Sequence, residues 1–178
     1  MGSKQRRAQI LEILKKTNHA LTGSQLSETC EVTRQVIVAD IALLRAMGEE
    51  IMATPQGYLY AKKPAVTRVR HTIAAKHSSD PEQIREELYT IIDNGGIARD
   101  VTVEHPVYGE MIGNLQISSR FDVENFLQKL TASKAEPLLV LTDGLHLHTI
   151  ETPSETVYHR IHTELSQKGF LVKENNDI

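Results

Sequence analysis

The sequence predicts an α+β protein made of an N-terminal winged helix-turn-helix and a second domain of sheet and helices. Two helical stretches near the N-terminus are separated by only three residues and are followed by a hairpin pattern. After residue 66, strand-like and helical stretches alternate, which is typical of helices packed on a sheet. Between the two parts, Lys62-Lys63-Pro64-Ala65 breaks both periodicities. We therefore expect domains over residues 1–63 and 66–178.

The central element of the first domain is the stretch from Thr33 to Gly48. Apolar residues recur at Ile37, Ile41 and Leu44, which is the spacing of a helical stripe. Thr33 suits the N-cap, and Gly48 suits a left-handed C-cap. The candidate DNA-contacting residues lie in the first turns of this helix, on the face opposite the apolar stripe. They are Thr33, Arg34, Gln35 and Val38. Arginine pairs with guanine and glutamine with adenine in the major groove, so this helix has the chemistry to read bases.

The flanking segments favour a winged helix over an ordinary amphipathic helix. Thr22 and Gln25 have the spacing of a capping box for a short helix that ends near Thr29, and Cys30-Glu31-Val32 then forms the turn. Further upstream, Lys4 to Lys16 is expected to be a helix. Its expected inward side chains are Ile10, Leu11 and Leu14, and its expected outward ones are Arg6, Arg7, Lys15 and Lys16.

A hairpin is expected after the candidate recognition helix, which runs from Thr33 to Gly48. Short strand-like runs at Ile51 to Thr54 and Tyr58 to Tyr60 flank Pro55-Gln56-Gly57, whose proline and glycine favour a turn. We interpret this hairpin as the wing, with Gln56 and Tyr58 as candidate DNA contacts.

Composition and charge set further bounds. The hydrophobic share of 40% permits a normal core, and the single cysteine excludes a disulfide framework or a cysteine-rich zinc finger. The net charge of −3 divides into +5 over residues 1–70 (11 Lys+Arg, 6 Asp+Glu) and −8 over residues 71–178 (9 and 17). A basic first part suits phosphate contact. No apolar run is long enough for a membrane span and no signal peptide opens the chain, so we expect a cytoplasmic protein without membrane contact.

The second domain is expected to hold an antiparallel or mixed sheet with helices packed on it. The expected strands are Val66 to Ala75, Ile97 to Glu104, Glu110 to Ile117, Leu138 to Leu141, Leu145 to Ile150 and Phe170 to Val172. The expected helices run from Asp80-Pro81 to Asn94-Gly95-Gly96, from Asp122 to Ser133 and from Pro153 to Lys168. Asp143-Gly144 between two of these strands is a strong hairpin signal.

Histidines provide the candidate chemistry of this domain. His146 and His148 lie two apart on a strand, so both rings leave the same face and form a possible pair of metal ligands. His77, between a strand and a helix, is a third candidate. On that helix Glu87 borders the buried stripe, whereas Glu86 lies on the far side. Three imidazoles and a carboxylate would suit zinc, nickel, manganese or iron, and ligand type alone does not choose among these metals.

The other histidines rank lower as ligands. His159 and His162 lie mostly outside the apolar stripe of the last helix, His19 falls in a loop and His71 is a strand residue. His105 precedes a proline in a tight connection, so it is either hydrogen-bonded structure or part of a pocket wall.

Several segments resemble the nicotinate-responsive repressors of bacterial NAD biosynthesis and niacin uptake genes, the NiaR family. They are TRQVIVADIALLR, ATPQGY, VEHPVYGE, EPLLVLTDGLHLHTIE and KGFLV, and the resemblance extends over about residues 5–173. VEHPVYGE and GLHLHTIE are its most specific parts. The family joins a winged helix to a three-histidine (3H) domain. The resemblance implies a homodimeric repressor that binds an inverted-repeat operator in double-stranded DNA, with nicotinate as co-repressor. It also implies a divalent metal held at His77, Glu87, His146 and His148.

Nicotinate offers a carboxylate and a pyridine nitrogen, either of which can bind a metal with an open coordination position. We expect His105 and Tyr108 in the wall of the effector pocket. A metal-responsive repressor, in which the ion itself is the signal, remains an alternative. A metal-dependent hydrolase fused to a DNA-binding domain is a weaker alternative, because the sequence has no nucleophile elbow, P-loop or His-Glu-x-x-His motif. We therefore expect a regulator and not an enzyme.

Overall fold

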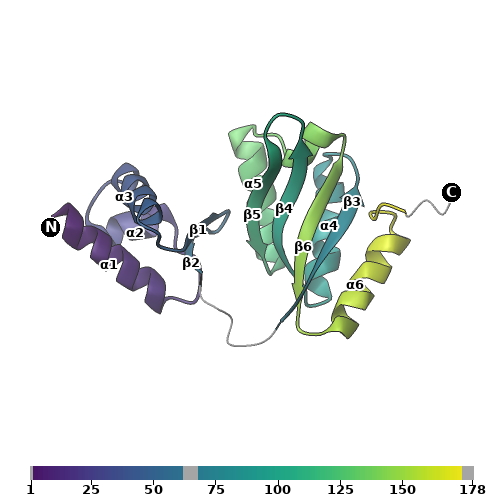
Figure 1. Cartoon of the computed structure of the whole chain (residues 1–178), viewed down its shortest axis with the longest axis horizontal. Helices are drawn as coiled ribbons and strands as arrows, with labels where there is room; N and C mark the ends of the chain where they lie inside the picture. Colours follow the sequence, from purple (N-terminus) through teal and green to yellow (C-terminus); the bar gives the residue numbers. More distant parts are fainter. Residues whose placement is uncertain (1, 62–67, 174–178) are drawn as a thin grey trace. The chain divides into compact units, whose positions relative to one another are not determined.

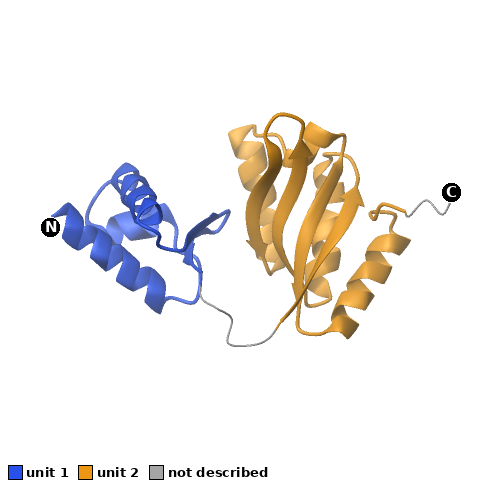
Figure 2. Cartoon of the chain, in the orientation of Figure 1, with its two compact units in different colours: residues 1–64 blue, residues 65–178 orange. Residues whose placement is uncertain are grey.

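The computed structural model describes residues 2–61 and 68–173. The chain forms two compact units, residues 1–64 and 65–178 (Figure 2), and each has its own hydrophobic core. The expected boundary at 62–65 lies outside the described residues, as do the first two residues of the strand expected from Val66. Among the described residues, no helix combines the length and the apolar character needed to cross a bilayer.

Unit 1 is a winged helix-turn-helix, as predicted. Its elements are α1 (Ser3–Lys16), α2 (Gly23–Cys30), α3 (Arg34–Ala46), β1 (Ile51–Thr54) and β2 (Gly57–Tyr60) (Figure 1). The two strands pair antiparallel and form the wing. The core gathers apolar side chains from all three helices and from β1: Ile10, Leu14, Leu26, Cys30, Ile37, Ile41, Leu44 and Ile51.

Local sequence signals account for the boundaries of the two helix-turn-helix helices. Thr22 and Gln25 make both hydrogen bonds of the predicted capping box at the start of α2. Glu31 adopts a left-handed conformation in the turn, and Gly48 does so after α3, with φ values of 53° and 93°. Thr33 is the N-cap of α3, although its side chain makes no capping hydrogen bond.

The expectation that Arg6 and Arg7 point outward to solvent is wrong. Arg6 Nε lies 2.5 Å from a carboxylate oxygen of Asp40, and Arg7 Nη1 lies 3.4 Å from the other. Asp40 is 3% exposed, so these ion pairs join α1 to the buried side of α3. Asp40 follows Ile37 by three residues and therefore falls within the buried stripe, where a carboxylate needs cationic partners. These two arginines are structural and not free for phosphate contact.

Unit 2 is a four-stranded antiparallel sheet with helices packed against it (Figure 1). Its elements are β3 (Val69–Lys76), α4 (Pro81–Asp93), β4 (Ile97–His105), β5 (Gly109–Ile117), α5 (Arg120–Ser133), the 3-10 helix η1 (Leu138–Thr142), β6 (Leu145–Thr152) and α6 (Glu155–Gln167). The strand order is β3-β6-β4-β5. In Figure 1, α4 and α5 cover one face of this sheet and α6 lies beside β3.

The predicted strand at Leu138 to Leu141 and its hairpin with the next strand are wrong. The segment is η1, and β6 pairs instead with β3 on one side and β4 on the other. Both edges of β6 are therefore hydrogen-bonded to other strands, so the segment before it has no edge with which to pair as a hairpin. Asp143 and Gly144 do have the positive φ values of a tight turn, 51° and 88°, but they join η1 to β6.

We predict that Asp40→Asn destabilises unit 1 by about 2 kcal/mol, because it leaves two largely buried guanidinium groups without their counter-charge. Hydrogen exchange of the α3 amides measures the free energy of unfolding of this unit separately from unit 2. Glu12→Gln is the matched control, since it removes an ion pair with Lys16 that lies at the surface. Equal exchange rates in the two variants would contradict the structural role of Asp40.

Candidate functional site

The helix that would enter the DNA groove presents the predicted residues at the surface. Thr33, Arg34 and Gln35 are exposed, and Val38 is 42% exposed. The side chain of Arg34 lies against Gly23 at the start of α2, where a Cβ atom on Gly23 would come within 3.3 Å of Arg34 Cγ and Nε. The Arg34 side chain therefore packs against the start of α2, and Arg34 remains exposed to solvent.

The wing is held against the helices by its glycine. Tyr58 exchanges two backbone hydrogen bonds with Leu21, of 2.9 and 2.7 Å. A Cβ atom on Gly57 would lie 2.4 Å from the Leu21 carbonyl oxygen, so only glycine permits this approach. The Tyr58 ring packs partly against the core of unit 1. Gln56 lies in the turn, where its backbone N–H donates to Thr54 Oγ1. Of the two predicted wing contacts, Tyr58 thus has a structural role as well.

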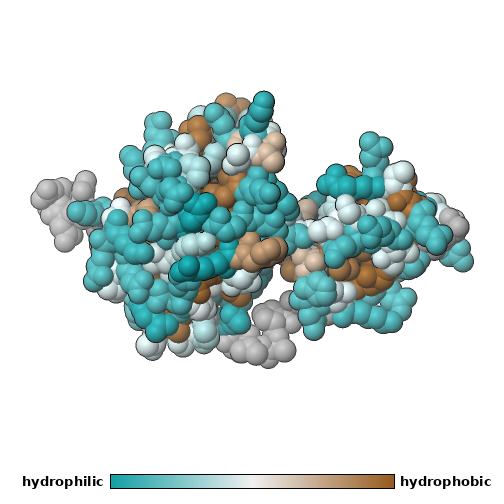
Figure 3. Space-filling view, turned by 180° about the vertical axis from the view of Figure 1, so that it is seen from behind, coloured by the Kyte–Doolittle hydropathy of each residue, from teal (hydrophilic) through white to brown (hydrophobic). Residues whose placement is uncertain are grey.

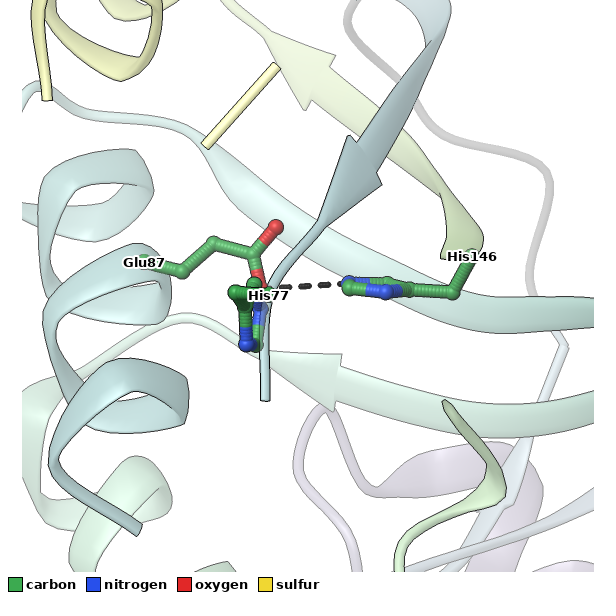
Figure 4. Close-up of side chains that lie close together, drawn as sticks. All are labelled: His77, Glu87 and His146. Carbon is green, nitrogen blue, oxygen red and sulfur yellow. Dashed lines mark hydrogen bonds and ion pairs between the residues drawn. The ribbon is translucent and has the colours of Figure 1, made fainter. Parts of the chain in front are cut away.

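In unit 2 the four predicted metal ligands lie together. His77 follows β3, Glu87 lies on α4, and His146 and His148 lie on the helix-covered face of β6. The Nε2 atoms of the three histidines approach the same oxygen, Glu87 Oε2, at 2.8, 3.3 and 3.4 Å for His77, His146 and His148. Figure 4 shows His77 and His146 pointing toward this carboxylate. Glu87 is 1% exposed, whereas Glu86 is exposed, as the helical spacing predicted.

The second nitrogen of each imidazole is fixed by a backbone carbonyl. Nδ1 of His77 lies 2.8 Å from Ser78 O, Nδ1 of His146 lies 2.8 Å from Gly144 O, and Nδ1 of His148 lies 2.6 Å from Asp100 O. A carbonyl oxygen only accepts, so each Nδ1 carries the proton and donates it. In the neutral ring Nε2 is then an unprotonated acceptor, and all three acceptors face a carboxylate oxygen. Such a group of acceptors is stable only around a positive charge, either protons or a metal ion.

The pKa values of the cluster reflect this need for positive charge beside the Glu87 carboxylate. Burial opposes the charged form of His77 and of His148, but the hydrogen bond and charge of Glu87 outweigh it and raise the pKa of both rings. Burial also opposes the Glu87 carboxylate. The charge of His148 and the hydrogen bonds from the three imidazoles nevertheless hold the pKa of Glu87 well below its usual range.

The donor set fits a transition metal. Oxygen and nitrogen ligand atoms of His77, Glu87 and His146 lie within 4.8 Å of one another, and His148 adds a third imidazole. Glu87 Oε1 is buried and has no hydrogen-bond partner, so the carboxylate has an unused acceptor inside the cluster. The three Nδ1–H···O bonds are the outer contacts that orient metal-bound imidazoles in proteins.

The close approach of two backbone segments makes the cluster possible. A Cβ atom on Gly144 would lie 2.1 Å from the His77 carbonyl oxygen, and His77 N donates to Gly144 O at 3.4 Å. Gly144 thus brings the start of β6 against the end of β3 and so places His146 near His77. Sequence reasoning assigned this glycine to a hairpin and missed its role, because the close approach depends on strand order.

Two cavities adjoin the cluster. A small one of about 30 Å³ reaches Glu87, His146 and His148 and is otherwise lined by apolar side chains, among them Leu88, Val101, Leu115, Phe126, Leu138 and Leu139. An open groove of about 650 Å³ is lined by Lys76, His77, Ser78, Ser79, Leu139, Val140, Asp143 and Gly144. Leu139 borders both, so η1 separates the buried cavity from the groove.

His105 and Tyr108, expected in the effector pocket, line neither cavity. His105 Nδ1 accepts hydrogen bonds from the backbone N–H groups of Val107 and Tyr108, so this histidine stabilises the turn between β4 and β5. Tyr108 is 75% exposed. Of the two readings that the sequence left open for His105, the structure favours hydrogen-bonded structure. The remaining histidines lie outside the cluster: His159 and His162 are exposed, and His71 stacks on Tyr158.

A winged helix-turn-helix joined to a second compact unit of sheet and helices is typical of a DNA-binding regulator. Residues 6–59 match a helix-turn-helix domain family and residues 70–174 match the 3H domain family. The chain is 48% identical to a probable transcription repressor NiaR of Thermotoga maritima, over 93% of this chain and 92% of that one. It is 40% identical to the transcription repressor NadR of Bacillus subtilis, over 95% and 94%.

The chain therefore belongs to the family of 3H-domain transcription repressors that includes these two proteins. Its function is DNA binding in transcription repression. The expectation of a regulator and not an enzyme is confirmed, because the relatives are named repressors and share the helix-turn-helix domain.

We predict that the chelator-treated protein loses stability as the pH rises from 6 to 8. A raised pKa in the folded state contributes stability that is complete below the ordinary histidine value of 6.5 and disappears as pH rises through the folded-state pKa. Urea unfolding at each pH, followed by a signal from unit 2, measures this change. Glu87→Gln removes the anion that raises both pKa values and should flatten the dependence. A steeper loss in Glu87→Gln than in the unaltered chain would contradict this explanation.

Proposed function

We propose that the chain represses NAD biosynthesis and niacin uptake genes as a homodimer on an inverted-repeat operator, with nicotinate as co-repressor and a metal ion in unit 2. The observation that carries the proposal is the convergence of three imidazole Nε2 atoms on Glu87 Oε2. Nicotinate, the regulated genes and the operator symmetry come from the family resemblance.

The proposed metal ligands are His77, Glu87, His146 and His148. Zinc, nickel, manganese and iron all accept imidazole and carboxylate together. A bound metal would supply an electrophilic centre for a carboxylate oxygen or a pyridine nitrogen. The three backbone carbonyls fix the rings in the tautomer that leaves Nε2 free for it.

The surroundings of the cluster support a small organic effector. The buried cavity is mostly apolar and suits an aromatic ring, whereas the open groove is lined in part by Ser78 and Ser79, whose hydroxyl groups can donate to a carboxylate. A cavity of about 30 Å³ holds roughly one water molecule, so a pyridine ring enters only if the wall moves. We infer that η1, a single short helical segment between cavity and groove, is the part that moves.

Control of DNA binding follows from linkage. Nicotinate strengthens repression to the extent that it binds the DNA-competent arrangement of the dimer more tightly than the other arrangements. DNA recognition itself is proposed for the exposed start of α3, with Thr33, Arg34, Gln35 and Val38 facing the groove and Gln56 and Tyr58 in the wing.

A second candidate is a repressor in which the ion alone is the signal. It is favoured by the completeness of the cluster, since three imidazoles and one carboxylate already offer four ligand atoms to an ion. The two candidates differ in whether metal without nicotinate changes operator affinity.

We predict that the chain binds one divalent transition metal ion and that His148→Ala lowers its metal affinity by at least about tenfold, because one of four ligands is lost. Isothermal titration with zinc and with nickel measures the affinity. His159→Ala, which removes an exposed histidine of α6, is the matched control and should bind as the unaltered chain does. Equal affinities in the two variants would exclude His148 as a ligand.

For co-repression, we predict that nicotinate tightens binding to an inverted-repeat operator selected from a randomised DNA pool only when metal is present. Gel-shift titrations with and without nicotinate, before and after chelation, measure this effect. His148→Ala should keep basal DNA binding and lose the response. Arg34→Ala should weaken operator binding by about 5- to 150-fold under every condition, since a bidentate base contact contributes about 1–3 kcal/mol.

Unchanged operator affinity at saturating nicotinate, with metal bound, would exclude nicotinate as co-repressor. A full response to metal alone would favour the ion-sensing candidate.

A further inference from the structure

One face of the unit 2 sheet has no cover among the described residues of that unit. Figure 1 shows the strands in front of α4 and α5, and these helices pack against the other face. On the uncovered face, Ile112 is 57% exposed, Leu145 45% and Leu147 36%. Exposed apolar side chains gathered on one sheet face are uncommon in monomers and mark an interaction surface. We call this surface the open face.

The strand register arranges the open face in rows that cross the sheet. Ala74 pairs with Leu147, Leu147 with Thr102, and Thr102 with Ile112. These four residues form a mainly apolar row across all four strands. The next row toward the start of β3 contains Thr72 and Thr149, which pair with each other. Threonines therefore border the apolar row on that side.

The two ends of the open face carry opposite charge. At one end Glu151 is 3% exposed and lies 2.9 Å from Arg70, 3.6 Å from Arg99 and 3.7 Å from Arg68, so this end has a net charge of +2. At the other end, Glu104 pairs with Glu110 and both are exposed. Lys76 lies in the same row, so this end has a net charge of −1.

We propose that the open face is the surface through which two copies of this chain associate, with the two-fold axis parallel to the rows. An axis in this direction reverses the order of the rows, so the arginine end of each copy faces the Glu104 and Glu110 end of the other. An axis along the strands would instead place arginines on arginines. Two-fold interfaces must be self-complementary, and only the first arrangement is.

The size of the open face is sufficient for a specific dimer. Four strands of eight residues span about 26 by 19 Å, or about 500 Å² for each copy, at roughly 3.3 Å per residue and 4.8 Å between strands. Two copies then bury about 1,000 Å², which is near the lower limit for a specific interface, and protruding side chains add to it. The proposal deepens the homodimer of the proposed function and rests on it.

The helical side of unit 2 offers a natural control. Figure 3, viewed from behind, shows a mostly hydrophilic surface there with scattered hydrophobic residues. Phe121 on α5 is 74% exposed, so it is as accessible as Ile112 and lies on a helix that packs against the covered face.

The test is sedimentation velocity of the full chain as a function of concentration. We expect a dimer for the unaltered chain and for Phe121→Glu. Ile112→Glu should weaken association by at least about 30-fold, because it places two like charges in an apolar interface. Ile112 lies on β5, outside the metal cluster. Unaltered circular dichroism and zinc binding in Ile112→Glu establish that the fold is retained.

A second measurement tests the direction of the axis. The arginine row faces the acidic row when the axis lies midway between the apolar row and the Thr72–Thr149 row. The two Ile112 residues then lie on facing edge strands, displaced from each other by about 7 Å along the strand direction, at roughly 3.3 Å per residue. Ile112→Cys should therefore be cross-linked by a short bismaleimide, and Phe121→Cys should not. The one native cysteine, Cys30, is buried and does not compete.

A dimer that survives Ile112→Glu would overturn the open face as the interface and leave the homodimer intact. Dissociation by Phe121→Glu would assign the interface to the helical side. A monomeric unaltered chain would overturn both this proposal and the homodimer, while binding of single operator half-sites would still support the DNA-binding function.

Discussion

The structure of unit 2 depends on one electrostatic constraint: three imidazole acceptors and a carboxylate oxygen meet in a buried space. His77, His146 and His148 each use Nδ1–H for a backbone carbonyl, so Nε2 can only accept unless a proton is added. Four acceptors in contact repel one another without a cation. Protons satisfy the cluster at low pH, and a bound metal ion would satisfy it at neutral pH without charging the imidazoles. The sheet, α4 and the turn at Gly144 all serve to bring these groups together.

The same constraint relates unit 2 to the sensing role that we propose. Many complete and buried donor clusters that hold zinc are purely structural. This cluster adjoins both an apolar cavity and a groove at the surface, and Leu139 of η1 lines the two. Charge is also divided by function. Acidic residues dominate the second unit, whereas the exposed start of α3 carries the arginine and glutamine that we propose as DNA contacts.

Much of this arrangement could be predicted from the sequence because its signals are local. The capping box at Thr22, the three-residue turn before α3 and the two-residue spacing of His146 and His148 each act within a few residues of the chain. Helical spacing also separated Glu87 from Glu86. The predictions that were wrong or incomplete concern residues whose structural partners lie far away in the sequence. Leu138 to Leu141 has the composition of a strand, but β6 is paired on both edges by strands far away in sequence. Asp40 needed arginines from α1, and the role of Gly144 depended on the position of His77.

Convergence of the three imidazoles and Glu87 on one ion is best tested by X-ray absorption at the metal edge, on the whole chain loaded with one equivalent of zinc. We expect a first shell of three imidazole nitrogens and one carboxylate oxygen at about 2.0–2.2 Å, with the outer-shell scattering typical of histidine rings. Addition of nicotinate should add or replace a single light-atom ligand. A spectrum with one imidazole or none would show that the cluster of His77, Glu87, His146 and His148 does not hold the ion.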